Sequence, residues 1–305
     1  MTPSPSAPVR RFAGLIVFLP AFALGQLSEP AGSSGYKLLK LDISPRQAAL
    51  SGAGVALPGS EQEANAAIDP SDKIRLTAGW TSGYSQLDGK IEHVSWVDPL
   101  AGGTLFGRLR FQGFDNIPGY DIEDRGTGTY TASTWAAGCG YAHSLDVLLP
   151  GLVTGLALHG GMNHVDAVAS FAGWTDLGAR WTHGEFALGG SVRNWGFASI
   201  SDHDPETLPL QTQFGGSYTR RLPFDWTVSV LTDARWTIDE EWTLPVGLEA
   251  RWGMLALRSG WTVGLAESRP SFGVGIQGEA WGVDASMAWH GALGLSPGMS
   301  LTAGI

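Results

Sequence analysis

The residues best suited to acid–base chemistry are seven histidines, and they are scattered along the chain: His93, His143, His159, His164, His183, His203 and His290. No Gly-x-Ser-x-Gly elbow, His-Glu-x-x-His motif or phosphate-binding loop accompanies them. A lone histidine on a strand is more often a structural residue than a catalytic base. We therefore expect no catalytic residue and no enzyme activity.

A second group of chemically capable residues lies in the run Asp202-His-Asp-Pro-Glu206. Clustered carboxylates suit a hard cation such as calcium, but this spacing matches no known calcium loop, so we favour a solvated loop. The single cysteine, Cys139, rules out an intrachain disulfide and a cysteine-based zinc site. Apolar residues alternate with it, and we expect it to face lipid. No metal and no cofactor is expected.

The charged residues inside apolar stretches are a stronger signal. Each alternates with apolar neighbours, which places it on the polar side of a strand. We predict that eight of them face a common interior: Arg108, Arg110, Asp233, Arg235, Glu249, Arg251, Arg258 and Asp284. Buried charges must pair or stay wet. Two interpretations remain open, a network that packs the interior and anchors another segment, or a polar path or ligand site.

The strands that would position these charges are clearest at Trp226–Trp236 and Trp242–Trp252, where apolar and polar residues alternate strictly. Each strand has Trp at both ends of its apolar face, which suits the two water–lipid boundaries of a membrane barrel. We expect an aromatic girdle of Trp80, Trp226, Trp236, Trp242, Trp252, Trp281 and Trp289. The alternative is a soluble sandwich with Trp in its core.

Composition agrees with a membrane barrel. The 305 residues include 43 Gly and 13 Trp, and only 16% are charged, against about 25% in an average protein. Mean hydropathy is close to zero, far below that of a helical membrane protein. The net charge of −10 argues against nucleic acid as a partner.

Residues 1–25 read as a secretory signal peptide. Arg10 and Arg11 precede the apolar run Phe12–Leu24, and Ala23-Leu-Gly25 supplies small residues for cleavage. No later stretch reaches the roughly 18 apolar residues of a spanning helix. Cleavage would remove two arginines and no acidic residue, so the formal charge would fall from −10 to −12.

Residues 26–72 are predicted to form a linker and a short-helix plug inside one mouth of the barrel. Two capping boxes, Ser44–Gln47 and Ser60–Glu63, would start helices that end near Gly52 and before Asp69-Pro70. The alternative is a loose periplasmic tail.

Residues 73–305 are predicted to form a transmembrane antiparallel up-and-down β-barrel of about 14 strands, an all-β fold. Loops are expected at Asp115–Gly128 and Ile200–Pro209, and His164–Gly173 fits a short helix or a bent strand. The alternating run Met299–Ile305 is expected to close the ring against the first strand.

The sequence also resembles the PorV/PorQ-like outer-membrane family. The C-terminal strands carry this resemblance in Gly247-Leu-Glu-Ala-Arg-Trp, Leu257-Arg-Ser-Gly-Trp, Ser271-Phe-Gly-Val-Gly-Ile, and Val283-Asp-Ala leading into Leu293–Leu301. The N-terminal part carries it in Tyr36-Lys-Leu-Leu-Lys-Leu and Arg46-Gln-Ala-Ala-Leu-Ser-Gly-Ala-Gly-Val, and the middle in Asp121–Tyr130 and Asp176-Leu-Gly-Ala-Arg-Trp. The resemblance implies a FadL-type barrel with an N-terminal plug that serves type IX protein secretion.

Two functions follow as expectations. The first is an adaptor or shuttle of type IX secretion in the outer membrane, with secretion-machinery proteins or cargo bound at its extracellular loops. The alternative is a FadL-like transporter of hydrophobic small molecules, and a structural barrel without a ligand is a third hypothesis. A continuous apolar tunnel would favour transport, whereas a charged and filled lumen would favour the adaptor. The expected surroundings are outer-membrane lipid.

Overall fold

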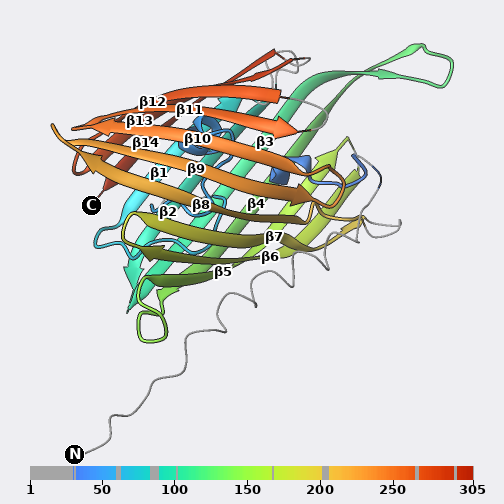
Figure 1. Cartoon of the computed structure of the whole chain (residues 1–305). Coiled ribbons are helices and arrows are strands. Elements are labelled where there is room, and N and C mark those ends of the chain that lie inside the picture. The colour runs from blue at the N-terminus through green and yellow to red at the C-terminus, as the bar shows by residue number, and fades with distance from the viewer. Residues whose placement is uncertain are drawn as a thin grey trace, which may run out of the picture.

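The chain forms a closed antiparallel barrel of fourteen strands in this computed structural model (Figure 1). The structure describes residue 30 and residues 32–59, 63–82, 89–100, 102–166, 168–200, 206–264, 268–291 and 294–304. The predicted signal peptide and Asp202–Pro205 of the possible calcium loop lie outside these residues.

Each strand pairs with its neighbours in sequence, as in an up-and-down barrel. The strands are β1 (Arg75–Ser82), β2 (Lys90–Leu100), β3 (Gly103–Tyr120), β4 (Gly126–Ser144), β5 (Leu152–Val165), β6 (Val168–His183), β7 (Phe186–Ile200), β8 (Gln211–Leu222), β9 (Trp226–Thr237), β10 (Thr243–Trp252), β11 (Leu255–Gly264), β12 (Ser268–Gln277), β13 (Trp281–His290) and β14 (Gly294–Gly304). The predicted fold class and strand number are confirmed.

The ring closes between β1 and β14. Their register runs from Arg75 opposite Gly304 to Thr81 opposite Gly298. Closure gives the edge groups of both strands a backbone partner, which lipid could not supply. We call the end where β1 begins and β14 ends the terminal rim, and the opposite end the loop rim.

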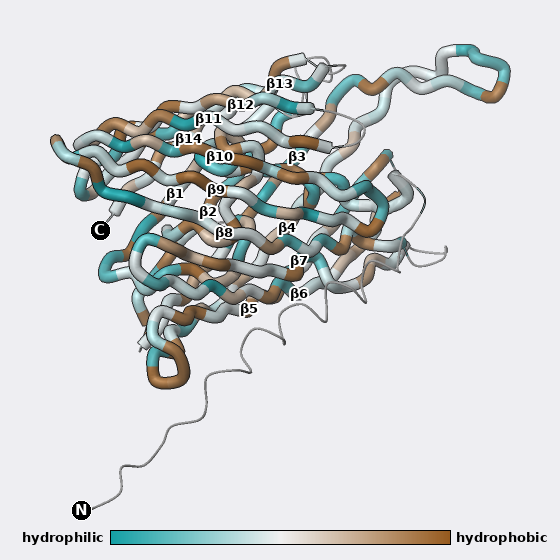
Figure 2. Tube along the Cα trace, viewed as in Figure 1, coloured by the Kyte–Doolittle hydropathy of each residue, from teal (hydrophilic) through white to brown (hydrophobic). Residues whose placement is uncertain are grey.

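The two faces of the wall differ in polarity as the alternation predicts. On β10, Leu244, Val246 and Leu248 are 41–51% exposed on the outside, whereas the inward Glu249 is 2% exposed. Figure 2 shows hydrophobic and hydrophilic residues alternating along the strands. An outer surface this rich in exposed aliphatic and aromatic side chains suits lipid. Cys139 is exposed on this wall.

One predicted loop, and the stretch predicted as a short helix or a bent strand, are both mostly strand. Only residues 121–125 turn within the predicted loop Asp115–Gly128, because β3 continues to Tyr120 and β4 starts at Gly126. This hairpin projects well beyond the barrel (Figure 1). The stretch His164–Gly173 is likewise a hairpin, in which β5 ends at Val165, β6 begins at Val168 and Asp166 takes a left-handed φ of 52°. Gly173, at the end of this stretch, has no side chain to mark a face of the strand.

A segment before β1 fills the inside of the barrel, and we call residues 32–72 the plug. It contains the 3₁₀-helix η1 (Lys37–Lys40) and the α-helix α2 (Pro45–Ala49), and its other described residues are irregular. The first predicted helix is therefore confirmed, although Ser44 makes no side-chain capping bond. Neither described helix is long and apolar enough to cross a membrane.

The second predicted helix, Glu61–Ile68, is not helical in its described part, residues 63–68. Polar groups of this segment form hydrogen bonds with the wall and with another part of the plug instead of with a helical turn. The Arg193 guanidinium donates to the Glu63 carbonyl oxygen, and the Asn65 amide donates to the Val55 and Ala179 carbonyl oxygens. Side-chain bonds of this kind compete with a helical backbone.

The hydrophobic core lies between the plug and the wall. Its largest cluster joins plug residues to strand residues and to Leu208 between β7 and β8: Tyr36, Leu38, Leu39 and Ile43 with Ile91, Ala136, Trp174, Ala198 and Leu208. Fully burying one large aliphatic side chain contributes about 1.5–3 kcal/mol. The plug is therefore bound by apolar contact as well as by polar bonds.

Inward-facing glycines let the plug approach the wall closely. A Cβ on Gly189 would meet the plug backbone at Val55, and lie 2.9 Å from the Ala56 Cα. On the same strand, a Cβ on Gly190 would meet nothing nearer than a carbonyl oxygen at 3.9 Å. A side chain at position 189 would therefore collide with the plug, whereas a side chain at position 190 would have room.

Substituting Gly189→Leu should displace the plug while the barrel still forms. Overpacking of this kind typically costs about 1–3 kcal/mol. We expect trypsin to cleave at Lys37 or Lys40 much faster in this variant than in the wild type, measured on the purified protein in detergent. Gly190→Leu is the matched control, and equal cleavage of the two variants would contradict a close-packed plug.

Candidate functional site

The filled lumen is the candidate functional site, and its most connected part lies toward the terminal rim. The Glu249 carboxylate accepts hydrogen bonds from three guanidinium groups, those of Arg46, Arg251 and Arg258, at 2.7–3.0 Å. Arg258 also pairs with Asp284. Arg46 belongs to α2 and the others to β10, β11 and β13, so this cluster ties the plug to three strands.

Most of this cluster is out of contact with water. The side chains of Arg46, Glu249, Arg258 and Asp284 are at most 8% exposed, whereas that of Arg251 is 35% exposed. Breaking a buried ion pair by removing one partner is far costlier than losing a surface pair, because the other charge stays buried. Removing the Glu249 carboxylate should therefore destabilise the protein more than removing any one of its three arginine partners.

A second anchor holds the middle of the plug. The Asp233 carboxylate accepts hydrogen bonds from the backbone N–H groups of Gly54 and Val55, at 2.7 and 3.0 Å, and from the Gln213 side chain. Gly54 has a φ of 139°, which glycine adopts without strain. Next to it, Arg235 pairs with Asp42 at 3.1 Å.

A third anchor lies at the loop rim, where the plug begins. Lys40 and Ser34 both donate hydrogen bonds to the Asp239 carboxylate, at 2.7 Å from each side chain. Burial would raise the pKa of Asp239, but the bonds from Lys40 and Ser34 outweigh it and hold that pKa below its usual value. Asp239 is therefore ionised at neutral pH.

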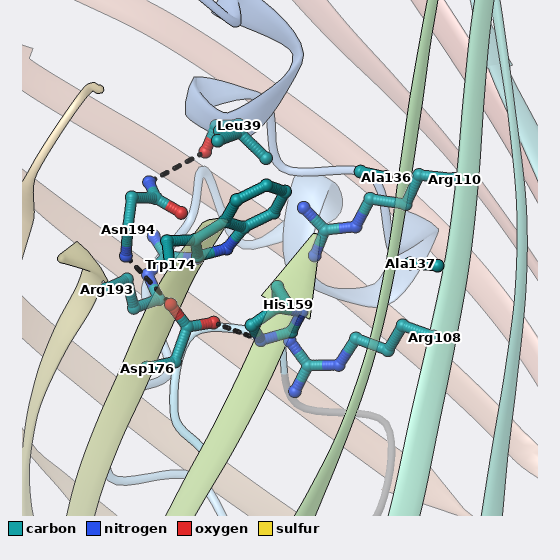
Figure 3. Close-up of a pocket in the computed structure, with 10 residues that line it drawn as sticks. All are labelled: Leu39, Arg108, Arg110, Ala136, Ala137, His159, Trp174, Asp176, Arg193 and Asn194. Atoms are coloured by element: carbon teal, nitrogen blue, oxygen red, sulfur yellow. Dashed lines mark hydrogen bonds and ion pairs between the residues drawn. The ribbon is translucent and has the colours of Figure 1, made fainter. Parts of the chain in front are cut away.

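A small cavity between η1 and β3–β7 is lined by a further group of ionisable residues, Arg108, Arg110, His159, Asp176 and Arg193 (Figure 3). Its volume of about 10 Å³ suits a single water molecule. His159 Nε2 lies 3.0 Å from Asp176 Oδ2, and the His159 ring stacks on Trp174 with centroids 5.3 Å apart. Arg108 and Arg110 reach into the same space from β3, and Arg110 pairs with Glu63 at 3.2 Å.

The wall is irregular beside this cavity. The β6–β7 register shifts between Thr175 and Leu177, and Asn194 takes a left-handed φ of 59°. The Asn194 N–H donates to Asp176 at 2.8 Å, while its side chain donates to the Leu39 and Pro209 carbonyl oxygens. Beyond Arg193, β7 no longer pairs with β8, and Glu206 forms an isolated bridge to Ala198 instead. Bulges of this kind often re-aim side chains at functional sites.

The eight charged residues expected inside do not form one site. Glu249, Arg251, Arg258 and Asp284 lie together, Asp233 and Arg235 hold the middle of the plug, and Arg108 and Arg110 line the small cavity. Sequence reasoning did not assign His159, Asp176, Arg180 or Arg193 to the lumen site, where Arg180 donates to the Ala67 carbonyl oxygen of the plug. The alternation of Asp176 and Arg180 within β6 was the signal that could have found two of them.

The tryptophans expected at the membrane boundaries differ in exposure. Trp80, Trp242, Trp252, Trp281 and Trp289 are 40–57% exposed. Trp226 stacks on Trp252 with centroids 5.9 Å apart. Trp236 is 4% exposed and packs with Leu210 and Ile238, so it is covered by protein and its assignment to the girdle is wrong.

Two larger hollows lie at the edges of the site. A cavity of about 250 Å³ opens at the terminal rim between the plug and the wall, and its lining includes three arginines, four glycines, Glu279 and Trp281. A groove of about 440 Å³ lies along β1–β4 and β14, lined mainly by apolar residues such as Trp80, Leu109 and Trp135. The arrangement as a whole can hold charges, anchor a plug and accept an apolar molecule at the wall.

The fold and the lipid-suited wall define a transmembrane β-barrel of the outer-membrane type. Among solved structures, the CymD monoaromatic hydrocarbon channel is similar over 86% of this chain and 97% of its own, with a TM-score of 0.58 and 10% identity. The P. putida toluene transporter TodX is similar over 85% and 96%, with a TM-score of 0.52 and 10% identity. At such identity the likeness concerns the fold alone.

No protein-family model matches the sequence, and no curated protein matches it. The resemblance to the PorV/PorQ-like family thus gains no support, whereas the barrel architecture expected from it does. The two similar structures are described as a channel and a transporter, and neither as an enzyme.

Replacing Glu249 by Gln should destabilise the protein strongly, because three arginines would lose their common carboxylate. We expect a loss of about 3–5 kcal/mol in the free energy of unfolding. Denaturant unfolding in detergent, followed by Trp fluorescence, measures it. Glu241→Gln changes an exposed carboxylate and should have little effect; equal midpoints for the two variants would show that the cluster adds nothing.

Proposed function

We propose that this barrel carries small apolar molecules across the outer membrane, with its terminal rim toward the periplasm and without enzyme activity. The likeness of its fold to a hydrocarbon channel and a toluene transporter, over most of each chain, is the observation that carries the proposal. Short turns on the periplasmic side are usual in such barrels, and both ends of the strand order lie at that rim.

The wall groove supports a route for an apolar solute. Its lining combines rings from β1, β3 and β4 with aliphatic side chains from β2, β3 and β14: Trp80, Phe111 and Trp135 with Val94, Leu109, Met299 and Leu301. The Phe111 and Trp135 rings lie 4.4 Å apart. Glu92 and His93 also line the groove. An apolar solute dissolved in the bilayer gains contact with the rings and aliphatic side chains there without entering the charged lumen.

Passage through the lumen requires the plug to move. The cavity beside η1 holds about one water molecule, and Arg108, Arg110 and Asp176 line it. The plug backbone is irregular and is held by hydrogen bonds to side chains. Water can replace these hydrogen bonds when the plug shifts. The plug's short helices and irregular course suit such displacement better than a packed helix would.

A disulfide between the plug and the wall tests whether transport requires the plug to move. The Ser51 and Ser271 hydroxyl oxygens lie 2.8 Å apart, so cysteines at both positions are placed to bond. In a Cys139→Ala background, we expect the oxidised Ser51→Cys/Ser271→Cys variant to slow the uptake of radiolabelled toluene into proteoliposomes to the protein-free level. Reductant should restore it.

The Ser51→Cys single variant under the same oxidation is the control. Uptake that continues with the plug locked would place the route outside the lumen. Wild-type uptake no faster than protein-free liposomes would overturn the transport proposal.

An adaptor role in type IX secretion is the second candidate, and a specific observation favours it. The charged, filled lumen suits a protein that works through its surface, and the β3–β4 hairpin projects beyond the barrel with Ile122 at its tip 98% exposed. Co-purification from native outer membranes followed by mass spectrometry tests it. We expect secretion components or cargo to be enriched, and their loss when residues 121–125 are replaced by a Gly-Ser turn; no enrichment would argue against this role.

A further inference from the structure

The cavity at the terminal rim has a lining unlike that of the rest of the lumen. It lies between plug residues Arg46, Pro58 and Gly59 and the ends of β1, β10 and β12–β14, with a volume of about 250 Å³. Among the residues that the structure describes, three guanidinium groups line it, those of Arg46, Arg75 and Arg251, and one carboxylate, that of Glu279.

Two of these arginines keep donors to spare. Arg75 donates no hydrogen bond to any residue that the structure describes, and shares a side of β1 with the buried Thr77 and Thr81. Arg251 uses its Nε for Glu249 at 2.8 Å, and its two terminal nitrogens donate to none of the described residues. An arginine carries five N–H donors in a fixed fork, so the cavity is bordered by unused donors.

Arginines also outnumber carboxylates among the described residues around the cavity. Arg46, Arg251 and Arg258 share Glu249 and Asp284, and Arg75 and Glu279 lie at the rim. A positive charge that borders a low-dielectric wall attracts an anion more strongly than one in open water.

We propose that this cavity binds a phosphate-type anion. Guanidinium groups match the oxygens of phosphate bidentately, and the free donors of Arg75 and Arg251 come from different strands, so a tetrahedral anion can bond both. The phosphate can belong to a soluble phosphate ester or to a lipid headgroup. Trp281, 50% exposed on the outer wall, also borders the cavity and brings the membrane boundary close.

The bound anion would join the plug to the barrel. Arg46, Pro58 and Gly59 of the plug line the cavity together with Arg75 and Arg251 of the wall, so an anion bound there lies between the two parts. Binding therefore stabilises the docked plug. The site is independent of the transported solute, because it lies in a polar mouth away from the apolar wall groove.

The test is a binding titration on the full mature chain in a neutral detergent, with inorganic phosphate and, separately, dioctanoyl phosphatidic acid as probes. We expect Arg75→Gln and Arg251→Gln each to weaken binding about tenfold, the size of a lost hydrogen bond to a charged group. Glu279→Gln should tighten it, because it removes the one repelling carboxylate. Arg221→Gln, at an exposed arginine on the same rim outside the cavity, should leave binding unchanged.

Each result of the titration either supports or overturns the proposed phosphate site. Saturable binding of both probes supports a soluble phosphate ester as ligand, and binding of the lipid alone supports a headgroup. Binding of neither probe overturns the proposal, as does binding that Arg75→Gln, Arg251→Gln and Glu279→Gln leave unaltered. A variant that unfolds is recognised by its Trp fluorescence, and the two remaining substitutions then decide.

Discussion

The hydrogen bonds between β1 and β14 are the interaction on which the whole architecture depends. Inside lipid, an unpaired backbone N–H or C=O group costs several kcal/mol, so a sheet that crosses a membrane must have no open edge. Pairing from Arg75–Gly304 to Thr81–Gly298 removes both edges at once. Once the ring is closed, every strand has one side toward lipid and one toward the lumen, and the alternation of the sequence follows from that geometry.

Closure also creates the problem that the plug solves. The inward residues are polar and many are charged. The lumen of a barrel of fourteen strands must therefore contain either water or a segment of protein. Here the plug fills it, and each group of inward charges has a partner from the plug: Arg46 for Glu249, the Gly54 and Val55 N–H groups for Asp233, and Asp42 for Arg235. Charge on the wall and polar groups on the plug are complementary parts of one interior.

Sequence reasoning predicts best where one rule applies along a whole element. On β10 the alternation alone gives the outward Leu244, Val246 and Leu248 and the inward Glu249 correctly. It fails where a residue's surroundings come from elsewhere in the chain. Trp236 has the correct side for lipid, but Leu210 and Ile238 cover it, and residues 63–68 have helical signals that the wall's donors override. The His159–Asp176 pair needs the β5–β6 register, which periodicity does not provide.

The plug's position sets the order in which the molecule can be assembled. Its partners come from the last third of the chain: Ser34 bonds Asp239, Arg46 bonds Glu249, and Ser51 bonds Ser271, with sequence separations of 203–220 residues. Such distant contacts form late and slowly. The plug, which precedes the strands in the chain, therefore lacks these partners until the final strands have formed, yet it must be inside before β14 closes the ring. During biogenesis the plug must therefore enter the lumen before β1 pairs with β14. A chain in which these strands pair first would form a barrel without its plug inside.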